Sequence, residues 1–408
     1  MTWVPPLLRD NEFRRYWGAA TISMFGDQVT SIAMPLVAVL TLDANAAQMG
    51  YLTALQWVPS LLFGLHAGAW ADRRARRRRV MITADLGRAV LLAAVPICYA
   101  FGVLTLWQLY IVTFAVGTLG IFFNVSTNTL FVSLVRQEQY VDGQSLLYGS
   151  RAMSFVAGPS AGGLMVQILT APIAVVADAL SFIGSAFFLS RIRPDEPPAA
   201  IGAGVLTAGA RFVARNSIVR ASLYGIAVIN FFNLMFSALF ALYAVRTLGV
   251  RPGELGLVLG AGALGGVIGV LVTKRITNAA GAGVAFVAGC FGFTIPLLLV
   301  PEAHGPHLAV VAVLFAAEFG SGFGVMVLDI SIGAIFSSVV PDDMQSRVMG
   351  AFQAVNYGTR PVGALLGGLI GASLGLRPAL WIAAAGGVLG AAVLVPSPVI
   401  RYRLPSST

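Results

Sequence analysis

The chain has 408 residues, of which 57% are hydrophobic and only 11% are charged. A soluble domain usually carries about 25% charged residues, so this composition argues against a water-exposed globular surface. Apolar stretches of about 20 residues, the length that a helix needs to cross a bilayer, recur along the whole chain. Sustained alternation with a period of two is absent, which argues against a transmembrane barrel. Helices are therefore expected as the spanning elements.

The apolar stretches predict an all-α membrane protein with twelve transmembrane helices. In chain order they cover residues 15–40, 48–71, 79–102, 105–128, 146–169, 171–191, 219–246, 254–273, 282–301, 307–330, 346–372 and 377–397. The three histidines, His66, His304 and His307, form no paired ligand motif, so we expect no metal site. Nothing in the sequence indicates a cofactor.

The positions of Lys and Arg predict the orientation of these helices. If the N-terminus is inside, twenty of the 26 Lys and Arg residues fall on the cytoplasmic side and three, Arg246, Arg251 and Arg377, fall outside. Cytoplasmic loops carry such an excess in membrane proteins. We therefore expect both termini in the cytoplasm. The same distribution accounts for the net charge of +9 without a nucleic-acid partner.

The longest polar connection lies near the middle of the chain. It contains the proline-rich segment 193–198, which cannot continue a helix. This predicts an N-terminal six-helix bundle at 1–190, a cytoplasmic linker at 191–218 and a C-terminal six-helix bundle at 219–408. A shift of 205 residues aligns Gly158, Gly162, Gly163 and Leu164 with Gly363, Gly367, Gly368 and Leu369. Parallel six-helix repeats are a known transporter architecture.

Ionisable groups within the predicted helices are the first candidates for function, because such groups are costly in a membrane. Asp27 lies mid-helix and shares one helical face with Ser23, Thr30 and Ser31, which we expect to face a cavity. Glu318 lies in the tenth predicted helix. Both are candidates for proton coupling or substrate binding. The alternative is a structural ion pair with Arg151 or Arg360.

Further polar side chains in the helices complete the set of candidates. They are Arg151, Arg360, Asp178, Asn230, Asn233 and Asn356, with Asn124, Thr127 and Asn128 in the fourth helix. Small polar residues in membrane helices often only bond neighbouring helices, and that reading stays open for each Asn. The phenylalanines beside Asn230 and Asn233 would suit an apolar substrate.

A compact motif ends the second predicted helix. Gly68 is followed four residues later by Asp72 and then by Arg73, Arg76 and Arg77. A basic stop-transfer loop that contacts anionic lipid would explain the arginines, but not the carboxylate ahead of them. Asp85 and Arg88, just inside the third helix, are expected to join this cluster.

These motifs resemble the major facilitator superfamily. The Gly68 to Arg77 segment is similar to its loop 2–3 signature, although Ala75 replaces the usual glycine. Gly158-Pro159-Ser160-Ala161-Gly162-Gly163 resembles the core of the helix 5 signature of its drug–proton antiporters. Gly26-Asp27-Gln28-Val29-Thr30, Asp178-Ala179-Leu180-Ser181-Phe182, Arg347-Val348-Met349-Gly350 and the segment 360–368 are similar to the branch of the enterobactin exporter, macrolide-efflux and Tap-like multidrug pumps.

The resemblance implies a proton-coupled exporter of small molecules in a bacterial inner membrane, working by rocker-switch alternating access. It implies that the helix 5 glycines and Pro159 permit bending and tight packing against the other half, and that Asp72 belongs to a cytoplasmic latch. We expect a monomer. The alternatives are a proton-coupled importer, a lysolipid flippase of the same fold and a non-transporting scaffold or sensor. An enzyme is not expected, since no nucleophile motif or phosphate loop is found.

The topology is tested by cysteine labelling in sealed cells, in a version with Cys98 and Cys290 replaced. Single cysteines at Ala44, His304 and Ser373 should react with an impermeant maleimide, and cysteines at Ala75 and Ala199 should not. External labelling at position 75 would contradict the predicted orientation.

Overall fold

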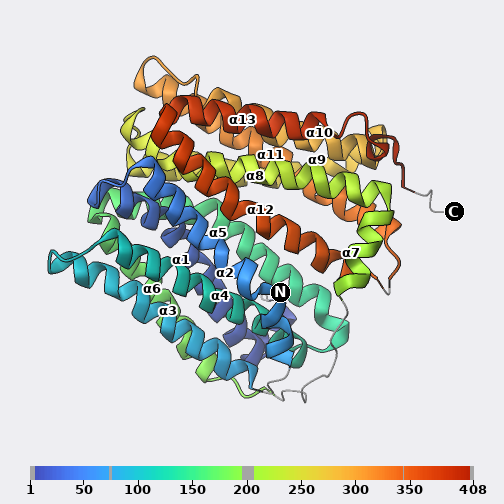
Figure 1. The fold of residues 1–408 in the computed structure, drawn as a ribbon. Helices are drawn as coiled ribbons and strands as arrows, with labels where there is room; N and C mark the ends of the chain where they lie inside the picture. The colour runs from blue at the N-terminus through green and yellow to red at the C-terminus, as the bar shows by residue number, and fades with distance from the viewer. Residues whose placement is uncertain (1–4, 73–75, 195–205, 343, 405–408) are drawn as a thin grey trace. The chain divides into compact units, whose positions relative to one another are not determined.

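The computed structural model describes residues 5–72, 76–194, 206–342 and 344–404. Within them the chain is helical and contains no strand (Figure 1). The helices are α1 (Asn11–Leu36), α2 (Ala46–Asp72), α3 (Arg77–Ala100), α4 (Leu106–Leu134), α5 (Tyr140–Leu169), α6 (Ala171–Ser190), α7 (Leu206–Arg215), α8 (Ser217–Arg246), α9 (Pro252–Ala280), α10 (Ala282–Thr294), α11 (His307–Val339), α12 (Gln345–Leu374) and α13 (Leu376–Ala392). A π-helical turn, Val37–Thr41, extends α1, and the 3₁₀ turn Ile295–Leu299 extends α10.

Each of the twelve predicted spanning helices is present, and several are longer than predicted. α9 runs to Ala280 and so includes Lys274 and Arg275, where the prediction ended at 273. The α-helical backbone satisfies its own hydrogen bonds, so a helix can continue beyond its apolar core. Nine helices in the described ranges are long and apolar enough to cross a membrane, and α13 is a shorter apolar helix.

α7 lies within the stretch that the sequence predicts as a polar linker. Asn216 separates it from α8 and caps α8, because its side chain accepts hydrogen bonds from the amides of Ile218 and Val219. Phe212 and Val213 of α7 pack into a hydrophobic cluster that also contains Val219. This short amphipathic helix was not predicted, because the stretch begins with a proline-rich segment that cannot continue a helix.

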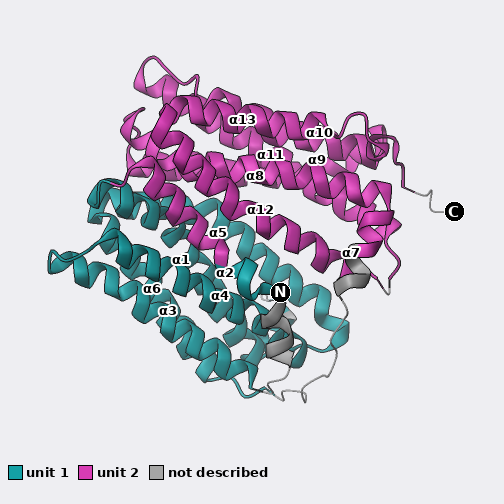
Figure 2. Cartoon of the chain, viewed as in Figure 1, with its two compact units in different colours: residues 1–43, 59–203 teal, residues 44–58, 204–408 magenta. Residues whose placement is uncertain are grey.

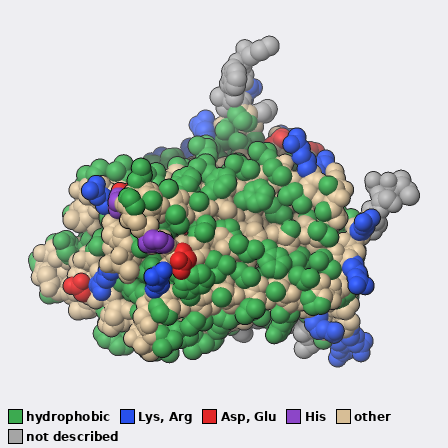
Figure 3. All heavy atoms as spheres, turned by 90° about the horizontal axis from the view of Figure 1, so that it is seen from above, with side chains coloured by type: hydrophobic (Ala, Val, Ile, Leu, Met, Phe, Trp, Pro, Cys, Tyr) green, Lys and Arg blue, Asp and Glu red, His purple; other side chains and the backbone are tan. Residues whose placement is uncertain are grey.

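The chain divides into two compact units (Figure 2). Unit 1 comprises residues 1–43 and 59–203, and unit 2 comprises residues 44–58 and 204–408. The core of unit 1 centres on buried aromatic side chains such as Phe13 and Tyr16, and the core of unit 2 contains Phe286 and Ile335. One face of the molecule is covered mainly by hydrophobic side chains, with charged side chains toward its ends (Figure 3). Such a surface suits lipid.

The repeated glycines make equivalent contacts in the two units. In unit 1, a Cβ added to Gly158 of α5 would lie 2.5 Å from Cβ of Gln28 on α1. In unit 2, a Cβ added to Gly363 of α12 would collide with the carbonyl oxygen of Phe231 on α8. Glycine at both positions lets two helices approach closely. Gly158 thus contacts α1 of its own unit, and the expected packing of the helix 5 glycines against the other half stays a prediction.

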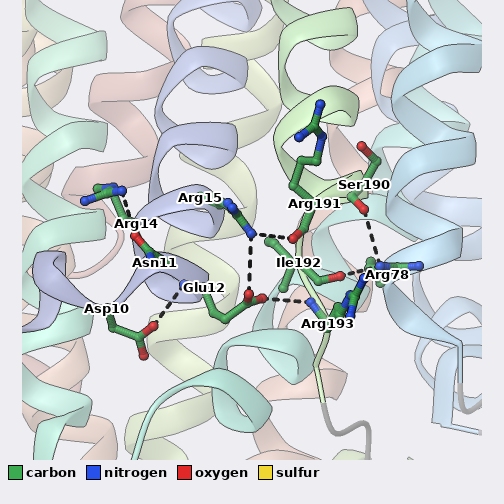
Figure 4. A network of polar contacts seen from close by, with 10 residues as sticks. All are labelled: Asp10, Asn11, Glu12, Arg14, Arg15, Arg78, Ser190, Arg191, Ile192 and Arg193. Carbon is green, nitrogen blue, oxygen red and sulfur yellow. Dashed lines mark hydrogen bonds and ion pairs between the residues drawn. The ribbon is translucent and has the colours of Figure 1, made fainter.

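Arginine side chains join three helices at one end of unit 1 (Figure 4). Arg15 of α1 donates to the carbonyl of Arg191 at 2.6 Å, and Arg78 of α3 donates to the carbonyl of Ile192. Glu12 accepts from the amide of Arg193 at 2.7 Å. Guanidinium groups thus bind carbonyls at the C-terminal end of α6, where the helix dipole favours a cation.

The glycine contacts predict unequal effects of adding one methyl group. Gly158→Ala and Gly363→Ala should each lower stability by about 1–3 kcal/mol, because the new Cβ would overlap a packed neighbour. Gly149→Ala on α5 is the matched control, since nothing lies within 4 Å of its added Cβ. Melting of the detergent-purified proteins measures this, and equal melting temperatures for all three variants would contradict it.

Candidate functional site

A cavity of about 410 Å³ lies within unit 1. It is formed by α1, α4 and α5. The lining residues are Tyr16, Met24, Asp27, Gln28, Asn124, Thr127, Phe131, Gln144, Leu147, Tyr148, Arg151, Ser154 and Phe155. Its volume lies in the range of small-molecule sites, and its lining combines aromatic rings with a few polar groups, as such sites do.

Two of the predicted candidates, Asp27 and Arg151, line this cavity. Of the predicted polar face of α1, only Asp27 does so. Ser23 is buried in the interior, and the cavity neighbours of Asp27 on α1 are Met24 and Gln28. The helix turns its 24–27–28 face to the cavity, whereas the adjoining Gly26 packs against α6.

Asp27 has a buried cationic partner. Oδ1 of Asp27 lies 3.7 Å from Nη1 of Arg88 on α3, and Arg88 also donates a hydrogen bond to Asp85. The side chain of Asp85 is fully buried, that of Arg88 is 4% exposed and that of Asp27 is 50% exposed. The guanidinium of Arg88 thus forms ion pairs with two carboxylates, and of these only Asp27 lines the cavity.

Aromatic rings fix the position of this guanidinium. The Cζ atom of Arg88 lies 4.5 Å from the ring centroid of Phe123 on α4 and 4.0 Å from that of Phe182 on α6. Rings at these distances attract a cation through their π faces. Arg88 is therefore held by three neighbouring elements, which leaves its position little freedom when Asp27 changes charge.

Asp178 lies directly behind Asp27. It is buried on α6 and accepts a hydrogen bond of 2.9 Å from Oγ of Ser181. A Cβ added to Gly26 would collide with Oδ1 of Asp178. The glycine preceding Asp27 therefore lets a second carboxylate approach the α1 backbone.

Unit 2 brings other predicted candidates together. Nδ2 of Asn230 on α8 donates to Oδ1 of Asn356 on α12 at 2.8 Å. Arg360 lies 4.1 Å above the ring of Trp57 and 5.5 Å from that of Tyr357. The Asn pair thus bonds two helices, as the structural alternative for these residues predicted.

Glu318 and Asn233 lie apart from these groups. Glu318 faces α9, where a Cβ added to Gly262 would lie 3.5 Å from its Oε2. Asn233 borders a second cavity of about 10 Å³, beside Phe232 and Phe236. That volume is about one water molecule, so it cannot hold a substrate.

The loop 2–3 motif is only partly described. Gly68 and Asp72 are described only as backbone positions of α2, and Arg73 lies outside the described residues. Arg76 is exposed before α3 and Arg77 is buried at its start. Asp85 and Arg88 bind each other, and Arg88 also contacts Asp27. That these two residues join the loop 2–3 motif stays a prediction, because the side chains of the motif up to residue 75 lie outside the described residues.

Two features of the cavity are absent from the sequence-based prediction. The predicted partner of Asp27 is Arg151 or Arg360, because nothing in the sequence places the side chain of Arg88 within reach of α1. Gln144, Tyr148 and Phe155, which line the cavity with Arg151, are not among the predicted candidates. Their spacing of three and four residues was a readable signal of one helical face.

Spanning helices around an internal polar cavity, with a carboxylate and an arginine facing it, define a polytopic membrane transport protein. The chain belongs to the Major Facilitator Superfamily, whose profile matches residues 16–363 and 223–407. It is thus a transport protein rather than an enzyme.

The chain is similar to named transporters along most of its length. It is 26% identical to the multidrug efflux pump Tap of Mycolicibacterium fortuitum, over 88% of this chain and 89% of that protein. It is 25% identical to the uncharacterized MFS-type transporter YfiS of Bacillus subtilis, over 92% and 91%. Among solved structures, the nucleoside transporter NupG shares the fold with a TM-score of 0.72 at 12% identity, covering 97% of this chain and 100% of that chain.

Because Arg88 and Asp85 form a buried ion pair, substitutions at these two positions should have non-additive effects on stability. Arg88→Gln should cost about 3–5 kcal/mol of stability, because it leaves the buried Asp85 carboxylate without its cation. Combining it with Asp85→Asn should restore much of that loss. Melting of the single and double variants measures the coupling, and strictly additive effects would contradict a shared ion pair.

Proposed function

We propose that this protein is a proton-coupled exporter of small molecules in a bacterial inner membrane, with both termini in the cytoplasm. The observation that carries the proposal is Asp27, a half-exposed carboxylate that lines the cavity of unit 1 and is paired with a buried arginine. The multidrug efflux pumps among the relatives support export as the direction of transport.

The proposed coupling follows from the charge balance around Arg88. With Asp27 ionised, the guanidinium is shared between Asp27 and Asp85. With Asp27 protonated, it is left to Asp85 alone, and the attraction between α1 and α3 weakens. Because Asp85 is fully buried and Asp27 faces the cavity, protons reach Asp27 rather than Asp85. The protonation of Asp27 would then bias the arrangement of the helices, as an ion with different affinities for two states does.

The remaining candidates take supporting roles in this proposal. Asp178, behind Gly26, and Glu318, on α11, are further carboxylates for proton transfer. The bundles at 1–190 and 219–408 would move as a monomer by rocker-switch alternating access, with the linker at 191–218 between them. The Gly68 to Arg77 motif, with Asp72 and Arg73, would form the cytoplasmic latch that the family resemblance implies.

Asp27→Asn tests the coupling. The amide keeps the size of the side chain but cannot exchange a proton, so export driven by an imposed pH gradient in inverted vesicles should fall to background. The folded yield should be unchanged, because Asp27 is half-exposed.

Asp142→Asn is the matched control for this variant. Asp142 is an exposed carboxylate in the first turn of α5 and does not line the cavity. It should export at the normal rate. Normal gradient-driven export by the Asp27→Asn protein would remove Asp27 from the coupling role.

A further inference from the structure

Arg151 is the arginine that lines the unit 1 cavity. Asp27 is paired with Arg88, but Arg151 makes no ion pair in the described part of the chain. Its contact is with Phe155 one turn along α5, 5.7 Å from Cζ to the ring centroid. Arg151 is exposed and lines the cavity. Ionisable groups that face such a cavity from membrane-spanning helices commonly mark the path of a substrate or ion, so Arg151 is a candidate group for binding an anion.

The contacts between α1 and α5 fix the position of Arg151 along the cavity. Oγ1 of Thr21 donates to Oγ of Ser150 at 3.0 Å, and Gln28 lies against Gly158. Asp27 is therefore level with about residue 157 of α5. Arg151 lies six residues earlier, which is about 9 Å along the helix axis. The backbone positions that carry the two charged side chains therefore lie at different levels of one cavity.

Groups around Arg151 suit the rest of an organic anion. Gln144 lies two turns before it on the same face of α5, and Tyr148 and Phe155 flank it by three and four residues. Amides hydrogen-bond polar substituents, and the aromatic rings cover apolar surface. A guanidinium binds a carboxylate or similar oxyanion through two parallel hydrogen bonds.

We propose that the cavity binds amphipathic aromatic anions, with the acidic group on Arg151 and the ring system against Tyr148 and Phe155. This inference rests on the proposed function for the direction of transport, but its binding chemistry depends only on the cavity. A cationic substrate is disfavoured, because Arg151 repels it and the negative charge of Asp27 is already paired with Arg88.

Xanthene dyes provide a matched set of probes, since fluorescein is anionic, rhodamine B zwitterionic and rhodamine 6G cationic on one tricyclic frame. Binding to the purified full-length protein is followed by fluorescence anisotropy. Arg151→Gln should weaken fluorescein by about tenfold or more, the loss of one charge-assisted hydrogen-bonded pair. Rhodamine 6G should bind the Arg151→Gln protein at least as tightly as the unaltered protein, because the charge that repels it is gone. Arg151→Lys should retain part of the fluorescein affinity.

Arg136→Gln is the control for lost positive charge, because Arg136 is exposed between α4 and α5 and does not line the cavity. Unchanged fluorescein binding in Arg151→Gln, equal weakening of all three dyes, or tighter binding of rhodamine 6G than fluorescein by the unaltered protein would overturn the inference. Vesicle export of the dyes separates the two proposals. Arg151-dependent binding without gradient-driven export would contradict the proposed export function and support the anion-binding site.

Discussion

One buried guanidinium organises unit 1. Arg88 brings together α1 through Asp27, α4 through Phe123 and α6 through Phe182, and it compensates the fully buried Asp85. A cation in this setting is stable only while at least one carboxylate stays ionised beside it. Asp85 meets this requirement from within α3, whereas the Asp27 carboxylate is the charged contact of Arg88 with α1. The charge of Asp27 therefore bears on the contact between Arg88 and α1 as well as on the polarity of the cavity.

The cavity depends on this arrangement and on close helix approach. Gly158 and Gly162 bring α5 against Gln28 and Val29 of α1, which fixes the register of the wall that carries Arg151. Larger side chains at these positions would push α5 outward and separate the charged groups of α1 and α5. The small residues at this helix contact are therefore needed both for packing and for the geometry of the cavity.

Much of the fold could be predicted from the sequence. Apolar length and the distribution of Lys and Arg are properties of single segments, so all twelve spanning helices were found and the orientation could be proposed. The ends of the helices were less predictable, as α9 shows, because a helix continues past the apolar core. α7 was missed because proline and charge dominate the stretch around it.

The site was predictable only in part, for a related reason. Asp27 and Arg151 stand out because a charge within an apolar segment is conspicuous, whereas the pairings of Asp27 with Arg88 and of Asn230 with Asn356 depend on which helices are neighbours, and no local pattern encodes that.

The glycine contacts of the two units are accompanied by different polar side chains. The 205-residue shift that superposes Gly158 on Gly363 places Asn356 at the position of Arg151 and Arg360 at the position of Phe155. In unit 1 the arginine faces a cavity, whereas in unit 2 the asparagine bonds α8 and the arginine stacks on Trp57. Glycines at corresponding positions thus bring helices together in both units, while the side chains beside them differ. In unit 1 these side chains border a cavity, and in unit 2 they bond neighbouring helices.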